Sequence, residues 1–221
     1  NRGCTPYDLN NDYIYLNNKT LNISSNDIKK GNYKNLNQKV KEYIINNNLY
    51  LEKQIKEYMS LKRYKHTISV KKTALEIYKN NKSYLNRNKV ITAALLHDIA
   101  KEYPKNKTKI IMKNHYPTYM DESESLYHQY VGEYLANKKF KITDKEILEA
   151  IRYHTTGNEN MGPLAKLIYA SDKIEPTRGY DSSYLINECK KNLDKGFIKV
   201  LEDNLSYLKT KNMKYINEET E

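Results

Sequence analysis

The chain has 221 residues, with 38 Lys and Arg against 27 Asp and Glu, which gives a formal net charge of +11. Its two cysteines lie far apart, so neither a disulfide framework nor a cysteine-based zinc site is expected. The polar start and the lack of an apolar run of about 18–20 residues argue against a signal peptide and a membrane span, and we expect a cytoplasmic protein.

The positive charge is almost entirely lysine scattered among asparagines, because the chain holds only five arginines. Such a distribution favours phosphorylated ligands through long-range attraction, without forming the basic stripe of a nucleic-acid-binding protein. Nucleic acid is therefore not expected as a partner.

The first fifty residues have a mixed pattern. Residues 12–16 and 21–23 are predicted as short strands. Ser24 to Asp27 offers capping residues for a helical turn that reaches Lys30, and Gly31 breaks it. Residues 38–47 then form a short helix with an apolar face.

From residue 51 onward the apolar spacing predicts an all-α fold. Two prolines and an aspartate mark helix boundaries: Pro104 ends one helix, Pro163 opens another, and Asp144 caps a third. The long stretch near the end has Gly196 as an expected interruption. The predicted helices are 55–78, 90–103, 107–114, 122–137, 144–154, 163–175 and 184–208.

Four of the five histidines and two aspartates fall on apolar faces of these helices. They are His66, His97, Asp98, His128, His154 and Asp172. Each alone is more often a satisfied core residue, but a buried imidazole beside a carboxylate costs several kcal/mol without partners. Five helices that all direct such groups inward favour a hydrolytic metal centre, for which iron, manganese, zinc, cobalt and magnesium are chemically suitable. His115, beside Tyr116 and Pro117, is expected on the surface.

The ordered set of His66, His97-Asp98 and Asp172 resembles the HD phosphohydrolase superfamily, which implies an HD-domain helical bundle. Longer matches at residues 63–67, 94–101, 154–157 and 170–178 resemble the bacterial HD-domain symmetrical diadenosine tetraphosphatases. That resemblance covers about residues 51–210. Ser69 stands where we expect glycine.

Two neighbouring HD subfamilies fit less well. Guanosine tetra- and pentaphosphate hydrolases carry an acidic pair three and four residues after the motif aspartate, where this chain has Lys101 and Glu102. Cyclic-di-GMP phosphodiesterases add His-His-Glu and Gly-Tyr-Pro elements that this chain lacks.

The resemblance implies metal-assisted hydrolysis, with His66, His97, Asp98 and Asp172 as ligands of a first divalent metal, expected to be iron. His128 and His154 either hold a second metal or donate to phosphate oxygens. Asp98 and Lys101 are the predicted catalytic residues, since Asp98 can bridge metals or orient water, and Lys101 follows it by one helical turn. The alternative for Lys101 is a surface lysine.

Several other residues are predicted to contact the nucleotide. Guanidinium groups suit the capture of phosphate, and hydroxyls and amides at a loop can do the same. Glu175 is expected to be structural, tying a helix end to a loop. The predicted nucleotide-binding residues are Arg63, Lys101, Thr155, Thr156, Gly157 and Arg178.

Residues 14–16, 21–29, 40–44 and 49–50 resemble the carboxyl-terminal end of nicotinate mononucleotide adenylyltransferase. Asn26 replaces a threonine and Lys29 an arginine of that pattern. The α/β core that should precede it is not part of this sequence, which leaves open whether a full adenylyltransferase domain precedes residue 1 in the natural protein. We therefore expect residues 1–50 to be a remnant without transferase activity, residues 51–210 the HD domain and residues 211–221 a polar tail. An unrelated extension packed on the HD domain is the alternative.

The predicted function is metal-dependent hydrolysis of diadenosine tetraphosphate to two molecules of ADP, with a dinucleoside polyphosphate as substrate. An HD nucleotidase or phosphodiesterase for another nucleotide is the first alternative. A non-catalytic nucleotide- or RNA-binding module is the second. The sequence leaves open the native metal, whether one or two ions bind, the base preference, and whether the protein is a homodimer.

Overall fold

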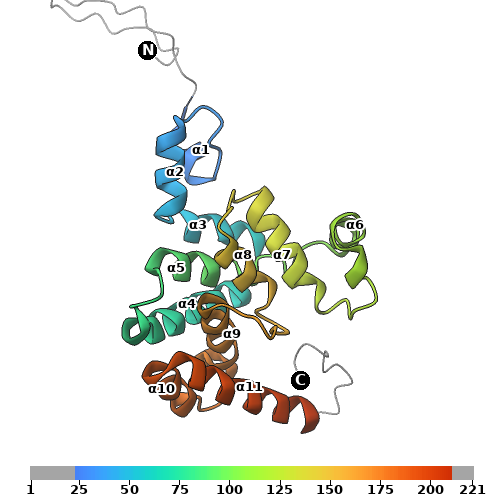
Figure 1. Cartoon of the computed structure of the whole chain (residues 1–221). Helices are drawn as coiled ribbons and strands as arrows, with labels where there is room; N and C mark the ends of the chain where they lie inside the picture. Colours follow the sequence, from blue (N-terminus) through green and yellow to red (C-terminus); the bar gives the residue numbers. More distant parts are fainter. Residues whose placement is uncertain (1–22, 211–221) are drawn as a thin grey trace, which may run out of the picture.

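The computed structural model describes residues 23–210, which form α-helices and short 3-10 helices and contain no strand (Figure 1). This confirms the all-α prediction. The strand predicted at 12–16, most of that predicted at 21–23 and the tail 211–221 lie outside the described residues. The α-helices are α1 Ser25–Lys29, α2 Gln38–Asn46, α3 Leu51–Ile55, α4 Leu61–Asn81, α5 Arg87–Leu96, α6 Lys105–His115, α7 Tyr127–Lys138, α8 Lys145–Arg152, α9 Pro163–Ile174, α10 Ser183–Lys191 and α11 Leu193–Thr210. The 3-10 helices are η1 Lys56–Tyr58, η2 Pro117–Tyr119 and η3 Pro176–Arg178.

The core lies where α4, α5, α8 and α9 pack against one another, with α7 against α8 and with α10 and α11 against α9. Figure 1 shows α1 and α2 at one end of this bundle and α10 and α11 at the other. Burying each large aliphatic side chain of the core contributes roughly 1.5–3 kcal/mol. Fully buried examples are Ile77, Leu95, Leu96, Ile99, Leu135, Ile151, Leu167 and Ile168.

The first helices follow the predicted pattern. The Ser24 side chain accepts a hydrogen bond from the Asp27 amide at the start of α1, and Gly31 follows with φ of +89°. Gln54 of α3 donates to the Tyr33 hydroxyl at 3.0 Å, and Asn48 donates to the Asn88 carbonyl at 3.0 Å. These bonds connect the amino-terminal helices to α3 and α5.

The prediction of a single helix over residues 55–78 is wrong. The backbone is extended at Met59, and a separate helix, α4, follows it. Ser60 is the reason: its hydroxyl accepts from the Arg63 amide at 3.3 Å and donates to Glu102 at 2.8 Å. Its own amide donates to the same carboxylate at 2.5 Å. A serine that satisfies the free amides of a helix start stabilises a boundary there. Glu102 thereby joins the start of α4 to the turns that carry Asp98.

The helix predicted over 90–103 is also shorter than expected, because α5 ends at Leu96 and a series of turns follows. His97 Nδ1 donates to the Ala94 carbonyl at 2.8 Å, so a side chain uses the acceptor that the amide of Asp98 would take in an α-helix. The helix predicted over 122–137 likewise begins later, at Tyr127, and the one predicted to reach His154 ends at Arg152.

Gly196 does not interrupt the last helical stretch, and that prediction is wrong. The break falls at Asn192, whose backbone is extended, and Gly196 lies inside α11. A Cβ atom at Gly196 would stand 2.4 Å from the Cα of Cys189 on α10. Glycine is therefore required for the close approach of the two helices. No helix within residues 23–210 has the length and apolar character needed to cross a bilayer.

Candidate metal centre

Six buried side chains from five parts of the chain converge in the middle of the bundle. His66 comes from α4, His97 and Asp98 follow α5, His128 comes from α7, His154 follows α8, and Asp172 comes from α9. None is more than 9% exposed. The structure thus brings together all six residues singled out in the sequence.

The first group consists of His66, His97, Asp98 and Asp172. His66 Nε2 lies 3.1 Å from Asp172 Oδ1 and 3.7 Å from Asp98 Oδ2. His97 Nε2 lies 3.7 Å from each of the same two oxygens. Two imidazole nitrogens and two carboxylates therefore surround one small volume.

The second group shares Asp98 with the first. His128 Nε2 and His154 Nε2 lie 3.5 and 3.4 Å from Asp98 Oδ1, and 3.2 Å from each other. Asp98 thus turns Oδ2 to one pair of histidines and Oδ1 to the other. Ligand atoms of His66, His97 and Asp98 lie within 4.8 Å of one another, as do those of Asp98, His128 and His154.

Three of the four histidines are held in one tautomer by the backbone. The Nδ1 atoms of His97, His128 and His154 lie 2.7–2.8 Å from the carbonyl oxygens of Ala94, Ser125 and Ile151. A carbonyl oxygen only accepts, so Nδ1 carries the proton and the neutral ring has its lone pair on Nε2. The lone pair of each ring consequently faces the cluster.

His66 is oriented by a carboxylate instead. Its Nδ1 donates to Glu175 Oε1 at 2.9 Å, and the Glu175 side chain is fully buried. The Thr177 amide and hydroxyl both donate to the same carboxylate at 2.7 Å. A carboxylate behind the ligating histidine is the arrangement that fixes ring orientation and raises ligand basicity in metal sites.

The titration behaviour of His97, Asp98 and Asp172 suits cation binding, and that of His66 differs. Burial lowers the pKa of His97 to about 4, so this ring is neutral at pH 7, as a metal ligand must be. Burial raises the pKa of Asp98 and Asp172, but the neighbouring imidazoles and basic side chains prevail and hold it well below the usual value. Burial lowers the pKa of His66, but the nearby carboxylates of Asp172 and Glu175 raise it to about 9, so this ring must release a proton before it binds a metal.

The donor set fits a divalent metal. The Nε2 atoms of His66 and His97 are buried and lack a hydrogen bond of acceptable geometry, a costly arrangement unless another partner satisfies them. Imidazole nitrogens with carboxylate oxygens, and no thiolate, are the ligands of hydrolytic centres. His66, His97, Asp98 and Asp172 would hold one ion, and Asp98, His128 and His154 are placed to hold another.

Two arginines and a lysine surround the first group. Arg63 Nη1 contacts Asp98 Oδ2 at 2.5 Å, and Arg178 Nη2 contacts Asp172 Oδ1 at 2.6 Å. Lys173 Nζ lies 3.2 Å from Asp172 Oδ2. The arginine side chains remain 27% and 39% exposed, so both can also meet a ligand from solvent. No functional role was predicted for Lys173, because nothing in the sequence distinguishes it from an ordinary residue near the end of a helix.

Lys101 and Thr155 lie beside the second group. Lys101 Nζ is 3.2 Å from His128 Nε2, and partial desolvation lowers its pKa. The Thr155 hydroxyl is 3.0 Å from the Nε2 atoms of both His128 and His154. Both side chains are therefore within reach of a phosphate bound at these histidines.

Thr156 and Gly157 are placed differently. The Thr156 hydroxyl is buried and contacts Gln129 and the Gly157 carbonyl, and the Gly157 amide donates to the Tyr153 carbonyl. Gly157 has φ of +78°, a conformation that favours glycine. Both residues shape the turn behind Thr155. His115 is exposed, as expected, and its ring lies against Tyr134.

Two cavities adjoin the cluster and share Arg178. The first, of about 600 Å³, is lined by His66, Arg63, Lys62 and Lys65 among others. The second, of about 630 Å³, is lined by Lys173 and by residues of α11. Volumes in this range are typical of ligand pockets.

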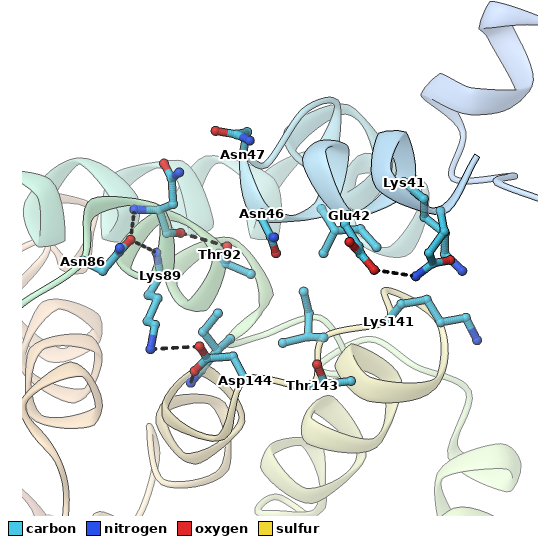
Figure 2. Close-up of a pocket in the computed structure, with 15 residues that line it drawn as sticks. Lys41, Glu42, Asn46, Asn47, Asn86, Lys89, Thr92, Lys141, Thr143 and Asp144 are labelled. Carbon is cyan, nitrogen blue, oxygen red and sulfur yellow. Dashed lines mark hydrogen bonds and ion pairs between the residues drawn. The ribbon is translucent and has the colours of Figure 1, made fainter. Parts of the chain in front are cut away.

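A third cavity, of about 580 Å³, lies between α2, α5 and the segment before α8 (Figure 2). None of the predicted site residues lines it. Lys89 contacts Asp144 at 2.8 Å across it, as Figure 2 shows, and Gln38 donates to Glu42 at 2.8 Å. We assign it no part in the chemistry of the cluster.

The fold and this cluster together define the class of protein. Residues 63–177, more than half of the chain, match the model of the HD domain, so the chain belongs to the HD domain family. That span includes all six clustered side chains and Glu175.

Specific relatives narrow the comparison. A protein of Bacillus subtilis named symmetrical bis(5'-nucleosyl)-tetraphosphatase is 34% identical over 72% of this chain and 86% of its own length. A Mycoplasma genitalium protein named "Probable nicotinate-nucleotide adenylyltransferase/Ap4A hydrolase" is 30% identical over 74% of this chain and 48% of its own. A crystal structure titled as a predicted HD superfamily hydrolase involved in NAD metabolism, from Clostridium acetobutylicum, has a TM-score of 0.64 and 28% identity over 82% of this chain and 91% of that one. The resemblance indicated by the sequence motifs is thereby confirmed.

Proposed function

We propose that this protein is a metal-dependent hydrolase that cleaves diadenosine tetraphosphate symmetrically to two molecules of ADP. The observation that carries the proposal is the position of Asp98 between two pairs of histidines, in a chain whose relatives include symmetrical tetraphosphatases. Water adds to an inner phosphorus, the bond from that phosphorus to the central bridging oxygen breaks, and each half leaves as ADP.

The residues divide this work between them. A divalent metal, when bound, polarises phosphoryl oxygens and makes water a better nucleophile at neutral pH. We propose that Arg63 and Arg178 hold phosphate oxygens against the first group, a role supported by the contact of each guanidinium with a ligand carboxylate and by its exposed edge. Lys101 and Thr155 do the same at the second group. The positive charges of Arg63, Arg178 and Lys101 offset the negative charge of four linked phosphates.

We propose iron as the metal of the first group. Imidazole and carboxylate ligands without thiolate support it, although manganese, cobalt, zinc and magnesium accept the same donor types. The placement of His128 and His154 supports a second ion that shares Asp98 with the first, which is the arrangement of two-metal hydrolases.

Three expectations stay predictions: a cytoplasmic location, a homodimer, and a division of the chain at about residue 50. For the last, the contacts of Asn48 and Tyr33 with α5 and α3 support an amino-terminal segment that packs on the HD domain. We propose that this segment has no transferase activity of its own.

Chromatography of the products tests the function. The purified protein is incubated with diadenosine tetraphosphate and Fe²⁺ or Mn²⁺, with a chelator-treated sample and an Asp98→Ala variant as controls. ADP as the sole nucleotide product, lost in both controls, is the expected result. Formation of ATP and AMP would contradict symmetrical cleavage, and full activity in the Asp98→Ala variant would contradict the assigned site.

A further inference from the structure

Symmetrical cleavage, the proposed function on which the following inference rests, requires the protein to bind the substrate on both sides of the scissile bond. The scissile bond lies midway along the substrate, so an adenosine diphosphate unit extends to each side of the metal centre. Two binding regions must therefore border the cluster from different sides. Only one of them needs to recognise a base for the enzyme to prefer a dinucleotide over a simple polyphosphate.

The two cavities beside the cluster differ in the chemistry of their walls. The first is mainly basic, and its lining residues include no tyrosine: they are Leu61, Lys62, Arg63, Lys65, His66, Glu175, Thr177 and Arg178. Such a wall suits phosphates, and it lacks the tyrosine rings of the second cavity. It lies on the α4 side of Arg178.

The second cavity has the features of a nucleoside pocket. Arg178 and Lys173 stand at its end nearest the metal centre, since both contact Asp172. Tyr180 and Tyr207 also line it, and these two residues are 45% and 54% exposed. Basic groups that contact a carboxylate of the metal centre, and aromatic rings on the wall of the same cavity, offer partners for the phosphates and the base of a nucleotide.

The two tyrosines come from different elements and are supported in different ways. The Tyr180 hydroxyl donates to the Lys173 carbonyl at 2.7 Å, which holds the ring beside the end of α9. Tyr207 lies in the last two turns of α11, next to Ser206 and one turn from Asn204, both of which also line the cavity. Large rings with few rotatable bonds provide contact area at a low entropic cost.

We propose that the cavity between η3 and α11 is the subsite for one adenosine of the dinucleotide, with the base stacked on Tyr207 and Tyr180, and Arg178 and Lys173 on the adjoining phosphates. Stacking on an aromatic side chain is tolerant of base identity, because every base presents a π-face. The pocket therefore recognises a nucleoside rather than adenine in particular.

Steady-state kinetics on diadenosine tetraphosphate, with ADP as the measured product, tests the subsite. Loss of a base stack predicts that Tyr207→Ala raises KM about tenfold, with the loss falling on KM rather than kcat, while Tyr207→Phe restores the wild-type KM because the ring is kept. Tyr184→Ala is the matched control, since Tyr184 is an exposed tyrosine of α10 that does not line this cavity.

A KM for Tyr207→Ala within twofold of the wild type, in protein that forms ADP normally, would overturn the subsite and leave the proposed function standing. A wild-type protein that forms no ADP would overturn the proposed function and the subsite with it. A Tyr207→Phe variant as impaired as Tyr207→Ala would also contradict stacking, because the ring alone is then insufficient.

Discussion

Glu175 Oε1 accepts a hydrogen bond from His66 Nδ1 at 2.9 Å, joining two residues that are 109 positions apart in the chain. The bond turns His66 Nε2 toward Asp172 and Asp98. Ser69, one turn after His66 and in place of an expected glycine, is among the polar neighbours that lower the pKa of Glu175. The departure from the family pattern therefore lies beside Glu175, the carboxylate that orients His66, and does not affect a metal ligand.

Removing Glu175 should weaken metal binding without removing a ligand. Outer-shell partners of ligating histidines typically contribute 10–100-fold in metal affinity or activity. We expect Glu175→Ala to lower Mn²⁺ affinity by about that factor in calorimetric titration, with Glu175→Gln in between because its amide oxygen still accepts from Nδ1. Equal affinity in all three proteins would contradict a positioning role for Glu175.

Arg152 should stabilise the fold through three tyrosines. Its guanidinium lies 3.5 Å from the ring centroid of Tyr130, 4.5 Å from that of Tyr119 and 5.1 Å from that of Tyr116, with Glu133 at 3.9 Å. Its side chain is only 10% exposed, so removal leaves the Glu133 carboxylate without its cation. We expect Arg152→Ala to lower the free energy of unfolding by about 3 kcal/mol.

Arg152→Lys should lose about half of that, because it keeps the charge but not the planar stack. Denaturant unfolding measures both variants, with Lys145→Ala, an exposed residue of the same helix, as the control. A stability of Arg152→Ala within about 0.5 kcal/mol of the control would show that the tyrosine contacts contribute little.

Gly196 should tolerate no side chain. An alanine Cβ would stand 2.4 Å from Cys189 Cα and 2.5 Å from its amide nitrogen, so α10 and α11 must separate. Although alanine favours a helix over glycine by about 1 kcal/mol, overpacking against backbone costs about 3 kcal/mol or more. Gly196→Ala is thus expected to unfold at lower denaturant concentration than the wild type, whereas Lys195→Ala, its exposed neighbour, is not. A stabilised Gly196→Ala protein would show that the helices are less closely packed.

Cys189 should make stability depend on pH in the alkaline range. Burial raises the pKa of its thiol to about 12 from an ordinary value of 9.0, so above pH 9 the unfolded chain loses a proton that the folded protein keeps. The contribution of the protonated Cys189 thiol to the free energy of unfolding is complete below pH 9 and is lost as the pH rises toward 12. Between pH 8 and pH 10 we expect a loss of about 1.4 kcal/mol attributable to this thiol.

The Cys189→Ala variant isolates that effect, because it lacks the thiol but keeps every other titrating group. The stability difference between wild type and variant should shrink from pH 8 to pH 10. A difference that stays constant with pH would mean that the thiol titrates normally in the folded protein.

The convergence of the six metal-centre residues could be predicted from the sequence for a physical reason. Each of His66, His128, His154 and Asp172 sits at helical spacing from apolar residues, and an apolar stripe must face the core. Residues that share such stripes on several helices of one bundle are directed to the same interior. The family motifs then indicated which of them act together.

The helix boundaries and supporting contacts could not be predicted in the same way. Ser60, which caps α4, is held by Glu102, 42 residues later, and His66 is oriented by Glu175, 109 residues later. No local pattern reveals such partners. The prediction that Gly196 interrupts a helix failed for a different reason. A glycine that ends a helix and one that lets two helices approach look alike in a sequence.

The central claim is that Asp98 serves two metal ions, one with His66, His97 and Asp172 and the other with His128 and His154. Anomalous diffraction at the iron edge, from crystals of iron-loaded and catalytically active protein, tests it most directly. The expected result is a strong peak within bonding distance of Asp98 Oδ2 and a second beside Asp98 Oδ1. A map of the active, iron-loaded protein with no peak among these six side chains would contradict it.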